Sequence, residues 1–141
     1  MLSKARTAIC ATFLTGLALV AQTTSAEALQ TDIGSGTGNC PSGQMCLWAD
    51  YDFHQGQGVS KLGSLATSTA ISDLGKIYKD GAVDWGMQDV ASSAYNNSGS
   101  RWCLYVDNGY SGTYLWVDPG WQGQLYSPFQ DSISSLKPCS G

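Results

Sequence analysis

The sequence predicts an all-β domain, an antiparallel sandwich or barrel built from two related units. A polar hexapeptide is written twice, as "QDVASS" (Gln88–Ser93) and "QDSISS" (Gln130–Ser135). Short runs of β-favouring residues are separated by turn clusters at intervals of about 8 to 12 residues. No long stretch keeps a 3.6-residue apolar period, so we do not expect helices to dominate the fold.

The repeat extends well beyond the hexapeptide. The segments "CLWADYDFHQG" (Cys46–Gly56) and "CLYVDNGYSG" (Cys103–Gly112) share, in order, a Cys, a Leu, an aromatic residue, a small apolar residue and an Asp. A second aromatic residue and a Gly then follow in both. The chain therefore contains two copies of one structural unit, with a longer connection inside the first copy.

Three short runs are the best strand candidates, "MCLWA" (Met45–Ala49), "WCLYV" (Trp102–Val106) and "GTYLWVD" (Gly112–Asp118). In the third run the aromatic residues alternate with Leu and Val, which is the period of a half-buried strand. The best helical candidate is "TAISDLGK" (Thr69–Lys76), with one or two turns expected.

The first residues have the layout of a secretory signal peptide. Two basic residues precede an apolar run, Ile9–Ala21, and small residues follow, which predicts a signal peptide over residues 1–26. Cleavage is expected after Ala26 or Ala28. The apolar run is too short to span a bilayer and no second one follows, so we expect a secreted, extracellular protein without a membrane anchor.

The remaining chain divides into a leader and one domain. Residues 27–39 are rich in Gly, Ser and Thr and predict a flexible leader. We place the domain at residues 40–141, with its units at about 40–96 and 97–141. A chain of 141 residues with 43% hydrophobic residues suits a single core of this size.

The charge balance argues against nucleic-acid binding. Loss of the signal peptide removes two of the seven basic residues and none of the eleven acidic ones, which leaves a net charge of −6 (5 − 11). A nucleic-acid-binding domain usually carries a basic patch. We therefore expect no nucleic-acid partner.

Four cysteines remain once Cys10 is removed with the signal peptide. An even number in a small exported chain predicts two disulfides, for which three pairings are possible. We favour Cys40 with Cys46, which closes a short turn, and Cys103 with Cys139, which ties the end of the chain to its middle. A zinc site is the alternative, but zinc ligands usually come as close C-x2-C pairs, which this spacing lacks.

The second unit resembles a βγ-crystallin Greek-key motif. The resemblance rests on "YVDNGYSG", with aromatic residues at Tyr105 and Tyr110 and a Gly at Gly112, and on the later "QDSISS". Two such motifs form one crystallin-type domain, so the resemblance implies a βγ-crystallin-like β-sandwich of two Greek-key motifs. Gln88 and Gln130 stand where that family usually has Asn or Asp.

A narrower resemblance suggests a function. The stretches "CPSGQMCLW" and "VDWGMQDVASSAYNN", with the signal peptide, are similar to the secreted actinobacterial metallopeptidase-inhibitor family built on this fold. This implies a secreted, monomeric peptidase inhibitor whose partner is a secreted peptidase. The family's best-understood inhibitors carry the reactive bond on a protruding loop of the second unit with its own closely spaced cysteines. Asp107–Thr113 has no such insertion, so we assign no reactive-site residue and name Asn96–Trp102 and Lys61–Gly81 as candidate contact segments.

The repeated loops allow two interpretations. In the crystallin family they bind calcium, which takes six to eight oxygen ligands. The resemblance makes Asp89, Ser92, Asp131 and Ser134 the candidate ligands, with affinity reduced or lost because Gln replaces an acid at the first position. The alternative is structural, because Asp and Ser bond neighbouring backbone groups and the final Ser of such a loop can fasten the hairpin folded over it.

Catalysis finds little support in the sequence. The mature chain has one histidine, His54, and no G-x-S-x-G motif, so the usual nucleophile and base pairings lack parts. Paired carboxylates such as Asp50 and Asp52, or Asp107 and Asp118, could serve a glycosidase, but acidic residues two apart on a strand are common on solvated faces. We therefore expect a non-enzyme.

The alternative function is a calcium- or glycan-binding module with an antimicrobial or killer-toxin-like role. It draws on the repeated loops and on Trp121, which lies in the turn "DPGWQGQ". An exposed Trp in a turn can stack on a sugar or anchor a protein partner. The other tryptophans are expected mostly in the core.

Overall fold

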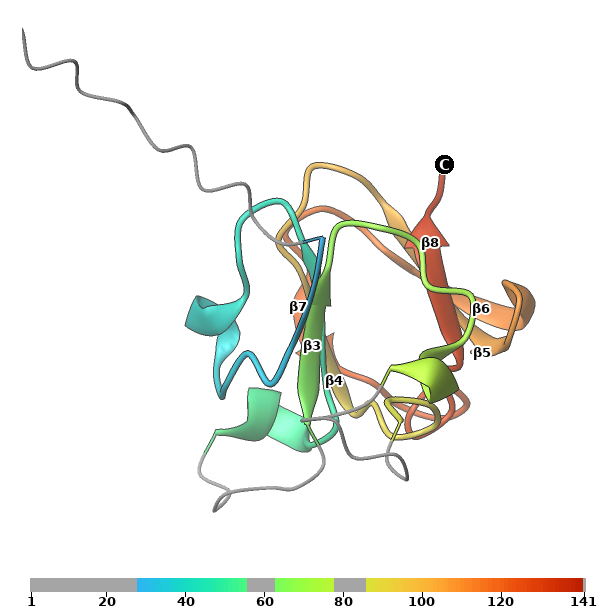
Figure 1. The fold of residues 1–141 in the computed structure, drawn as a ribbon, viewed down its shortest axis with the longest axis horizontal. Coiled ribbons are helices and arrows are strands. Elements are labelled where there is room, and N and C mark those ends of the chain that lie inside the picture. The colour runs from blue at the N-terminus through green and yellow to red at the C-terminus, as the bar shows by residue number, and fades with distance from the viewer. Residues whose placement is uncertain (1–27, 56–62, 78–85, 141) are drawn as a thin grey trace, which may run out of the picture.

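The structure, a computed structural model, describes residues 28–55, 63–77 and 86–140. It consists of two antiparallel sheets packed face to face (Figure 1). Sheet A has the strand order β1-β3-β2-β4-β7 and sheet B the order β6-β5-β8. The strands are β1 (Leu29–Thr31), β2 (Met45–Trp48), β3 (Ser64–Thr67), β4 (Ser93–Asn96), β5 (Trp102–Asp107), β6 (Ser111–Val117), β7 (Gln122–Gln124) and β8 (Ser135–Pro138).

Helical structure in the described residues is limited to three short 3-10 turns, η1 (Thr37–Asn39), η2 (Tyr51–His54) and η3 (Leu74–Lys76). The all-β prediction is therefore confirmed. The predicted helical segment shrinks to η3, where the Asp73 carboxylate accepts a hydrogen bond from the Gly75 N–H at 2.9 Å. None of the helical turns in the described part of the chain is long and apolar enough to cross a membrane.

The two units form Greek keys that exchange one segment. In each unit the first strand pairs with the second and the last, so β2 pairs with β3 and β4, and β5 pairs with β6 and β8. The third extended segment of each unit crosses to the sheet formed by the other unit. β7 of the second unit pairs with β4, and Ile71 of the first unit bridges to Leu136 in β8. Each sheet is completed by the other unit, so the two units fold as one domain.

The core lies between the sheets and draws on both units. Leu47 and Leu104 occupy equivalent positions in the two central strands and are fully buried. Burial of large apolar side chains is the main stabilising contribution in a domain of this size. The other buried members are Met45, Leu65, Ile71, Leu74, Met87, Ala91, Ala94, Trp102, Val117, Leu125, Ile133 and Leu136.

The N-terminal segment corrects one prediction. Residues 28–39, expected to be part of a flexible leader, lie against sheet A, where β1 pairs with β3 and extends the sheet. The Asp32 N–H donates to the Ser64 carbonyl at 2.7 Å, and the Trp48 indole N–H donates to the Gly34 carbonyl at 2.7 Å. The physical reason is tertiary, because this segment covers the outer face of sheet A and supplies a partner for a buried indole. The predicted signal peptide lies outside the described residues.

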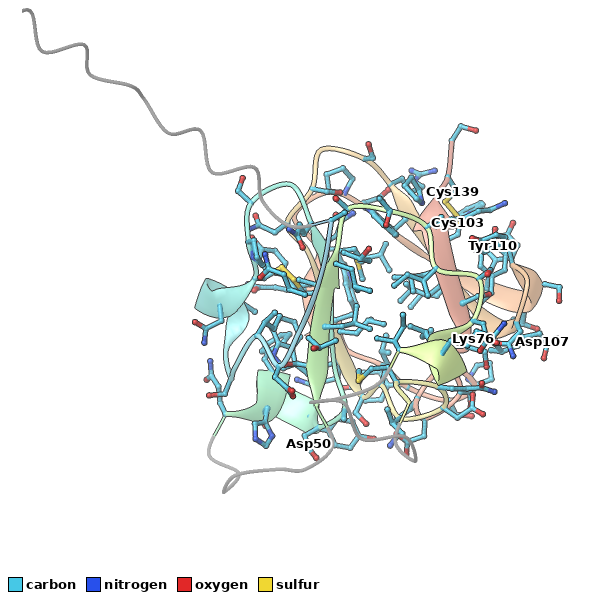
Figure 2. The ribbon with its side chains drawn as sticks, viewed as in Figure 1. Asp50, Lys76, Cys103, Asp107, Tyr110 and Cys139 are labelled. Carbon is cyan, nitrogen blue, oxygen red and sulfur yellow. A yellow bond between two sulfur atoms is a disulfide. The ribbon has the colours of Figure 1, made fainter. Side chains whose placement is uncertain are left out.

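Both predicted disulfides are present. Cys40 bonds to Cys46 with their Cα atoms 5.9 Å apart, and Cys103 bonds to Cys139 at 5.8 Å. Cys40 and Cys46 also join a small second core with Trp48 and Ala66 on the outer side of sheet A. Figure 2 shows the Cys103–Cys139 bond beside β8, where it ties β5 to the end of the chain. The zinc alternative is wrong because all four cysteines are in disulfides.

Candidate functional site

The two polar loops, residues 88–93 and 130–135, lie against each other and are here called the paired loops. The Ser92 hydroxyl donates to Asp131 Oδ1 at 3.0 Å. The Ser134 hydroxyl donates to Asp89 Oδ1 at 2.9 Å. All four predicted ligand residues are thus brought together, and each Ser contacts the carboxylate of the opposite loop.

The backbone of the paired loops follows the same two-fold pattern. The Asp89 N–H donates to the Ile133 carbonyl at 3.0 Å, and the Asp131 N–H donates to the Ala91 carbonyl at 2.9 Å. Asp89 and Asp131 are in the left-handed region, with φ of 57° and 51°. Asp is among the few residue types other than Gly that adopt this region readily. Asp at this position is therefore explained by the backbone as well as by its charge.

The glutamines that depart from the crystallin pattern contact the neighbouring carboxylates. The Gln130 amide donates to Asp131 Oδ2 at 3.0 Å, and the Gln88 amide donates to Asp89 Oδ2 at 3.4 Å. Each carboxylate therefore accepts a Ser hydroxyl on one oxygen and a Gln amide on the other. An Asp at the first position would instead add a second negative charge beside the first.

The last serine of each loop fastens a hairpin. The Ser93 hydroxyl donates to the Asp50 carbonyl at 2.7 Å and accepts the Phe53 N–H at 3.1 Å. The Ser135 hydroxyl donates to the Asp107 carbonyl at 2.6 Å and accepts the Tyr110 N–H at 2.9 Å. Both serines are fully buried. The structural interpretation is confirmed for these two residues.

The hairpin of the first unit needs this fastening. Asp52, Phe53 and His54 are three consecutive residues with positive φ, at 50°, 55° and 62°. In residues other than Gly this conformation raises the conformational free energy and persists only where surrounding contacts hold it. The Phe53 ring packs edge-on against Trp48 with their centroids 5.4 Å apart, and the His54 Nδ1 lies 2.6 Å from Asp50 Oδ2. His54 thus braces a hairpin.

A shallow depression of about 440 Å³ lies beside the paired loops. Its carboxylates, Asp50, Asp89 and Asp131, make it acidic, and oxygen ligands of this kind suit calcium. No group of three or more His, Cys, Asp or Glu close enough to hold a metal is found among the described residues. The donor chemistry therefore fits a calcium ion, but an ion would displace the Ser and Gln donors that already serve the carboxylates. The remaining lining residues are Ala49, Tyr51, Val90 and Ser92.

Comparison with known proteins places the chain in a family. The model of peptidase inhibitor family I36 matches residues 35–117, a range that runs from the N-terminal segment through β6. The chain belongs to peptidase inhibitor family I36. It is therefore a member of a family of proteinaceous peptidase inhibitors, and the partner class it implies is a peptidase.

Solved structures show that this I36 member has the βγ-crystallin fold. A structure titled "Evolution of the eye lens beta-gamma-crystallin domain fold" is 19% identical, with a TM-score of 0.59 over 80% of this chain and 98% of that one. A βγ-crystallin from Ciona intestinalis is 25% identical, with a TM-score of 0.51 over 69% and 100% of the two chains. Spherulin 3A from Physarum polycephalum is 19% identical, with a TM-score of 0.50 over 76% and 94%. No match was found among the curated proteins.

The acidic pairs considered for catalysis are engaged separately in this I36 chain. Asp52 Oδ1 accepts the Gln124 amide at 2.9 Å. Asp118 is paired with the Arg101 guanidinium. Asp107 is exposed at the tip of the β5–β6 hairpin, and its carbonyl accepts the Ser135 hydroxyl. In each pair at least one carboxylate is therefore bonded to a side chain outside the pair.

One candidate contact segment is a tightly bonded turn. In the Asn96–Trp102 segment, the Asn96 amide donates to the Ser100 and Val117 carbonyls, both at 2.8 Å. The Trp102 indole N–H donates to the Ser98 hydroxyl at 3.0 Å. The segment is rigid, and both of its end residues are buried. Of the other candidate, Lys61–Gly81, only residues 63–77 are described, and they include β3 and η3.

The hairpin that carries the reactive bond in related inhibitors is compact here, as the sequence predicts. Its Gly109 N–H donates to the Ser72 carbonyl at 2.8 Å, which ties the tip to the first unit. At Gly112 a Cβ would overlap the Asp107 side chain, so the repeated Gly is required by close approach. This hairpin carries no protruding loop.

The tryptophans of the described residues divide between core and surface, and Trp85 lies outside those residues. Trp48 and Trp102 are buried, and Trp121 is 36% exposed in its turn, as expected. Trp116 is 57% exposed, although most tryptophans other than Trp121 are expected from the sequence to lie in the core. The signal was present in the sequence, since Trp116 shares the outward phase of β6 with Tyr114 while Leu115 and Val117 take the other phase.

Proposed function

We propose that this chain is a secreted, non-enzymatic inhibitor that binds its target peptidase as a rigid monomer. The observation that carries the proposal is the match to inhibitor family I36 over residues 35–117. The disulfides and the apolar run near the N-terminus support secretion, because disulfides persist in oxidising compartments. The family match also favours inhibition over the glycan-binding and antimicrobial alternative.

The scaffold supplies the rigidity that tight inhibition requires. Two disulfides, a shared core and paired loops that bond to each other leave little of the described chain to be ordered on docking. Association costs translational and rotational freedom plus the ordering of loops and side chains, so a preordered surface binds more tightly. Non-enzymatic action follows, because inhibition by docking needs no catalytic group.

The test is an inhibition assay with three secreted peptidases of different mechanism, thermolysin, subtilisin and papain. We expect the purified mature protein to inhibit at least one of them at micromolar concentration or below. The same protein with its disulfides reduced and alkylated serves as the control and is expected to be inactive. Mass spectrometry of the inhibitor and a peptide substrate without peptidase check that it cleaves nothing itself.

We also propose that the paired loops form a weak calcium site. The observation that favours it is the crossed contact of Ser92 with Asp131 and of Ser134 with Asp89, beside a depression that also contains Asp50. The carboxylates would hold the ion, the Ser hydroxyls would turn from the carboxylates to the ion, and its charge would join the two units. Gln88 weakens the site because it brings no negative charge, and its counterpart in the second loop does the same.

Calcium is accordingly expected to raise the melting temperature of the wild-type protein by about 5 °C when its concentration is about tenfold above the dissociation constant. The double variant Asp89→Ala with Asp131→Ala is expected to lose this response. Asp118→Ala, which removes an exposed carboxylate away from the paired loops, is the control and should keep it. Absence of any rise in the wild type at 10 mM calcium, roughly ten times the weakest affinities of extracellular calcium modules, would leave the loops with their structural role alone.

A further inference from the structure

The edges of the two sheets are protected unequally. Sheet A ends in β1 and β7, which are three residues long, and β8 of sheet B carries Lys137 and Pro138 and is bridged by Ile71. β6, the other edge of sheet B, is seven residues long and contains no charged residue and no proline. Edge strands are normally shortened, charged or interrupted by proline because their free backbone groups pair with other chains. β6 lacks all three protections.

The outer face of sheet B beside this edge is aromatic. Trp116 and Tyr114 are 57% and 45% exposed, with ring centroids 5.9 Å apart. Tyr105 of β5 lies opposite Tyr114 with centroids 5.4 Å apart, and Tyr110 follows at 6.1 Å from Tyr105. Figure 2 shows Tyr110 on the same side of the molecule as the Cys103–Cys139 disulfide. We call these four residues and the outer edge of β6 the β6 face.

Two basic side chains lie over the rings of the β6 face, and one of them, Arg101, is ion-paired with Asp118. The Arg101 guanidinium lies 5.4 Å from the centroid of the Trp116 ring, and the Lys137 ammonium lies 4.9 Å from Tyr110 and 5.7 Å from Tyr105. The described residues contain one other Lys or Arg, Lys76. Trp, Tyr and Arg are the residue types that most often dominate the energy of a protein interface. The aromatic composition therefore favours a protein partner, and the Lys137 ammonium favours acidic side chains on that partner.

The face is also held rigid. β5 pairs with β6 on one side and with β8 on the other, and Cys103, opposite both Trp116 and Lys137, is bonded to Cys139. The tilt of 53° between the Tyr114 and Trp116 rings gives an angled surface instead of the flat platform on which a sugar ring stacks. Among the described residues no strand pairs with the outer edge of β6, which adds a second mode of recognition, in which an extended peptide pairs with the sheet edge.

We propose that the β6 face is the surface that contacts the target peptidase. An extended, acidic segment of the peptidase pairs along β6, Trp116 and Tyr114 anchor it, and Lys137 attracts its carboxylates. This inference rests on the proposed inhibitory function and names the surface that performs it. It places the contact on β6, next to the β5–β6 hairpin, and includes the suggested segment Asn96–Trp102 only at Arg101, which lies over Trp116.

The test measures the association and dissociation rates of surface variants with whichever of thermolysin, subtilisin and papain the wild-type protein inhibits. The double variant Trp116→Ala with Tyr114→Ala is expected to raise the dissociation constant by about 100-fold, mainly through a faster dissociation rate. Lys137→Glu is expected to lower the association rate by about tenfold and to reduce its dependence on salt. The matched control, Trp121→Ala with Tyr126→Ala, removes the same residue types from exposed turns and should stay within about twofold of wild type.

The outcomes separate the inference from the proposed function. If the wild type inhibits and the β6 variants, shown folded by their melting temperatures, inhibit equally well, the inference is overturned and the proposed function stands. If the wild type inhibits none of the peptidases, both fail. Two other results would also overturn the inference. If the β6 variants keep inhibition but lose binding to a glycan array, the face binds a sugar. If they keep inhibition but lose a concentration-dependent dimer, the face binds a second copy of the chain.

Discussion

Replacing Cys103 and Cys139 together by alanine is expected to lower the free energy of unfolding by about 4 kcal/mol. The bond joins residues 36 positions apart, and in the chain-entropy account a longer closed loop restricts the unfolded chain more. The Cys40–Cys46 bond closes a loop of only 6 positions, so its double alanine variant should lose about 2 kcal/mol. Urea denaturation of both variants and the wild type gives the comparison.

The two pairs control for each other because Cys40, Cys46 and Cys103 are all buried. Equal losses would show that packing of the sulfur atoms, and not loop closure, determines how much each bond stabilises the protein. A larger loss for the short loop would contradict the prediction. The second core around Cys46 and Trp48 would then be the more important one.

The last serine of each paired loop is expected to contribute more to stability than the serine just before it. Ser93→Ala or Ser135→Ala leaves a hairpin carbonyl and N–H without their partner inside the protein, which should cost about 2 kcal/mol of unfolding free energy. Ser92→Ala or Ser134→Ala removes one hydrogen bond to an exposed carboxylate, to which water can donate instead. The unfolding free energy should therefore fall by less than about 1 kcal/mol. Four single variants measured by the same denaturation assay test this contrast.

The two units should also behave alike in this experiment. The hydrogen bonds of Ser93 are repeated by Ser135 with nearly the same lengths, so the two losses should agree within about 0.5 kcal/mol. If Ser92→Ala and Ser134→Ala lower the unfolding free energy as much as the variants of the last serines do, the fastening role is wrong. The crossed contacts between the loops then hold the units together.

The repeat made much of this architecture predictable. Because the motif occurs twice with cysteines, aromatic residues and glycines in the same order, the strands at Met45, Trp102 and Ser111 could be placed from local pattern alone. The disulfides could be predicted because four cysteines allow only three pairings, and one of these closes a short turn between Cys40 and Cys46. Local chemistry also predicted that the final Ser of each loop fastens a hairpin.

Features that depend on distant contacts were not predictable. Residues 28–39 have the composition of a linker, yet β1 pairs with β3 because sheet A offers an edge and Trp48 needs a partner for its indole N–H. The donation of the Gln88 and Gln130 amides to neighbouring carboxylates requires the loop conformation to be known. Trp116 is one of the tryptophans that are expected mostly in the core because an aromatic residue is usually buried, although the alternation of β6 points it outward.

The most direct test of the account is a titration of a peptidase with the mature, disulfide-bonded protein. With the peptidase that responds in the inhibition assay, we expect the rate of peptide hydrolysis to fall as inhibitor is added and to level off near one inhibitor per active site, with the inhibitor recovered intact. Undiminished activity of thermolysin, subtilisin and papain at tens of micromolar protein would contradict the account, since a rigid inhibitor is expected to bind at or below micromolar concentration.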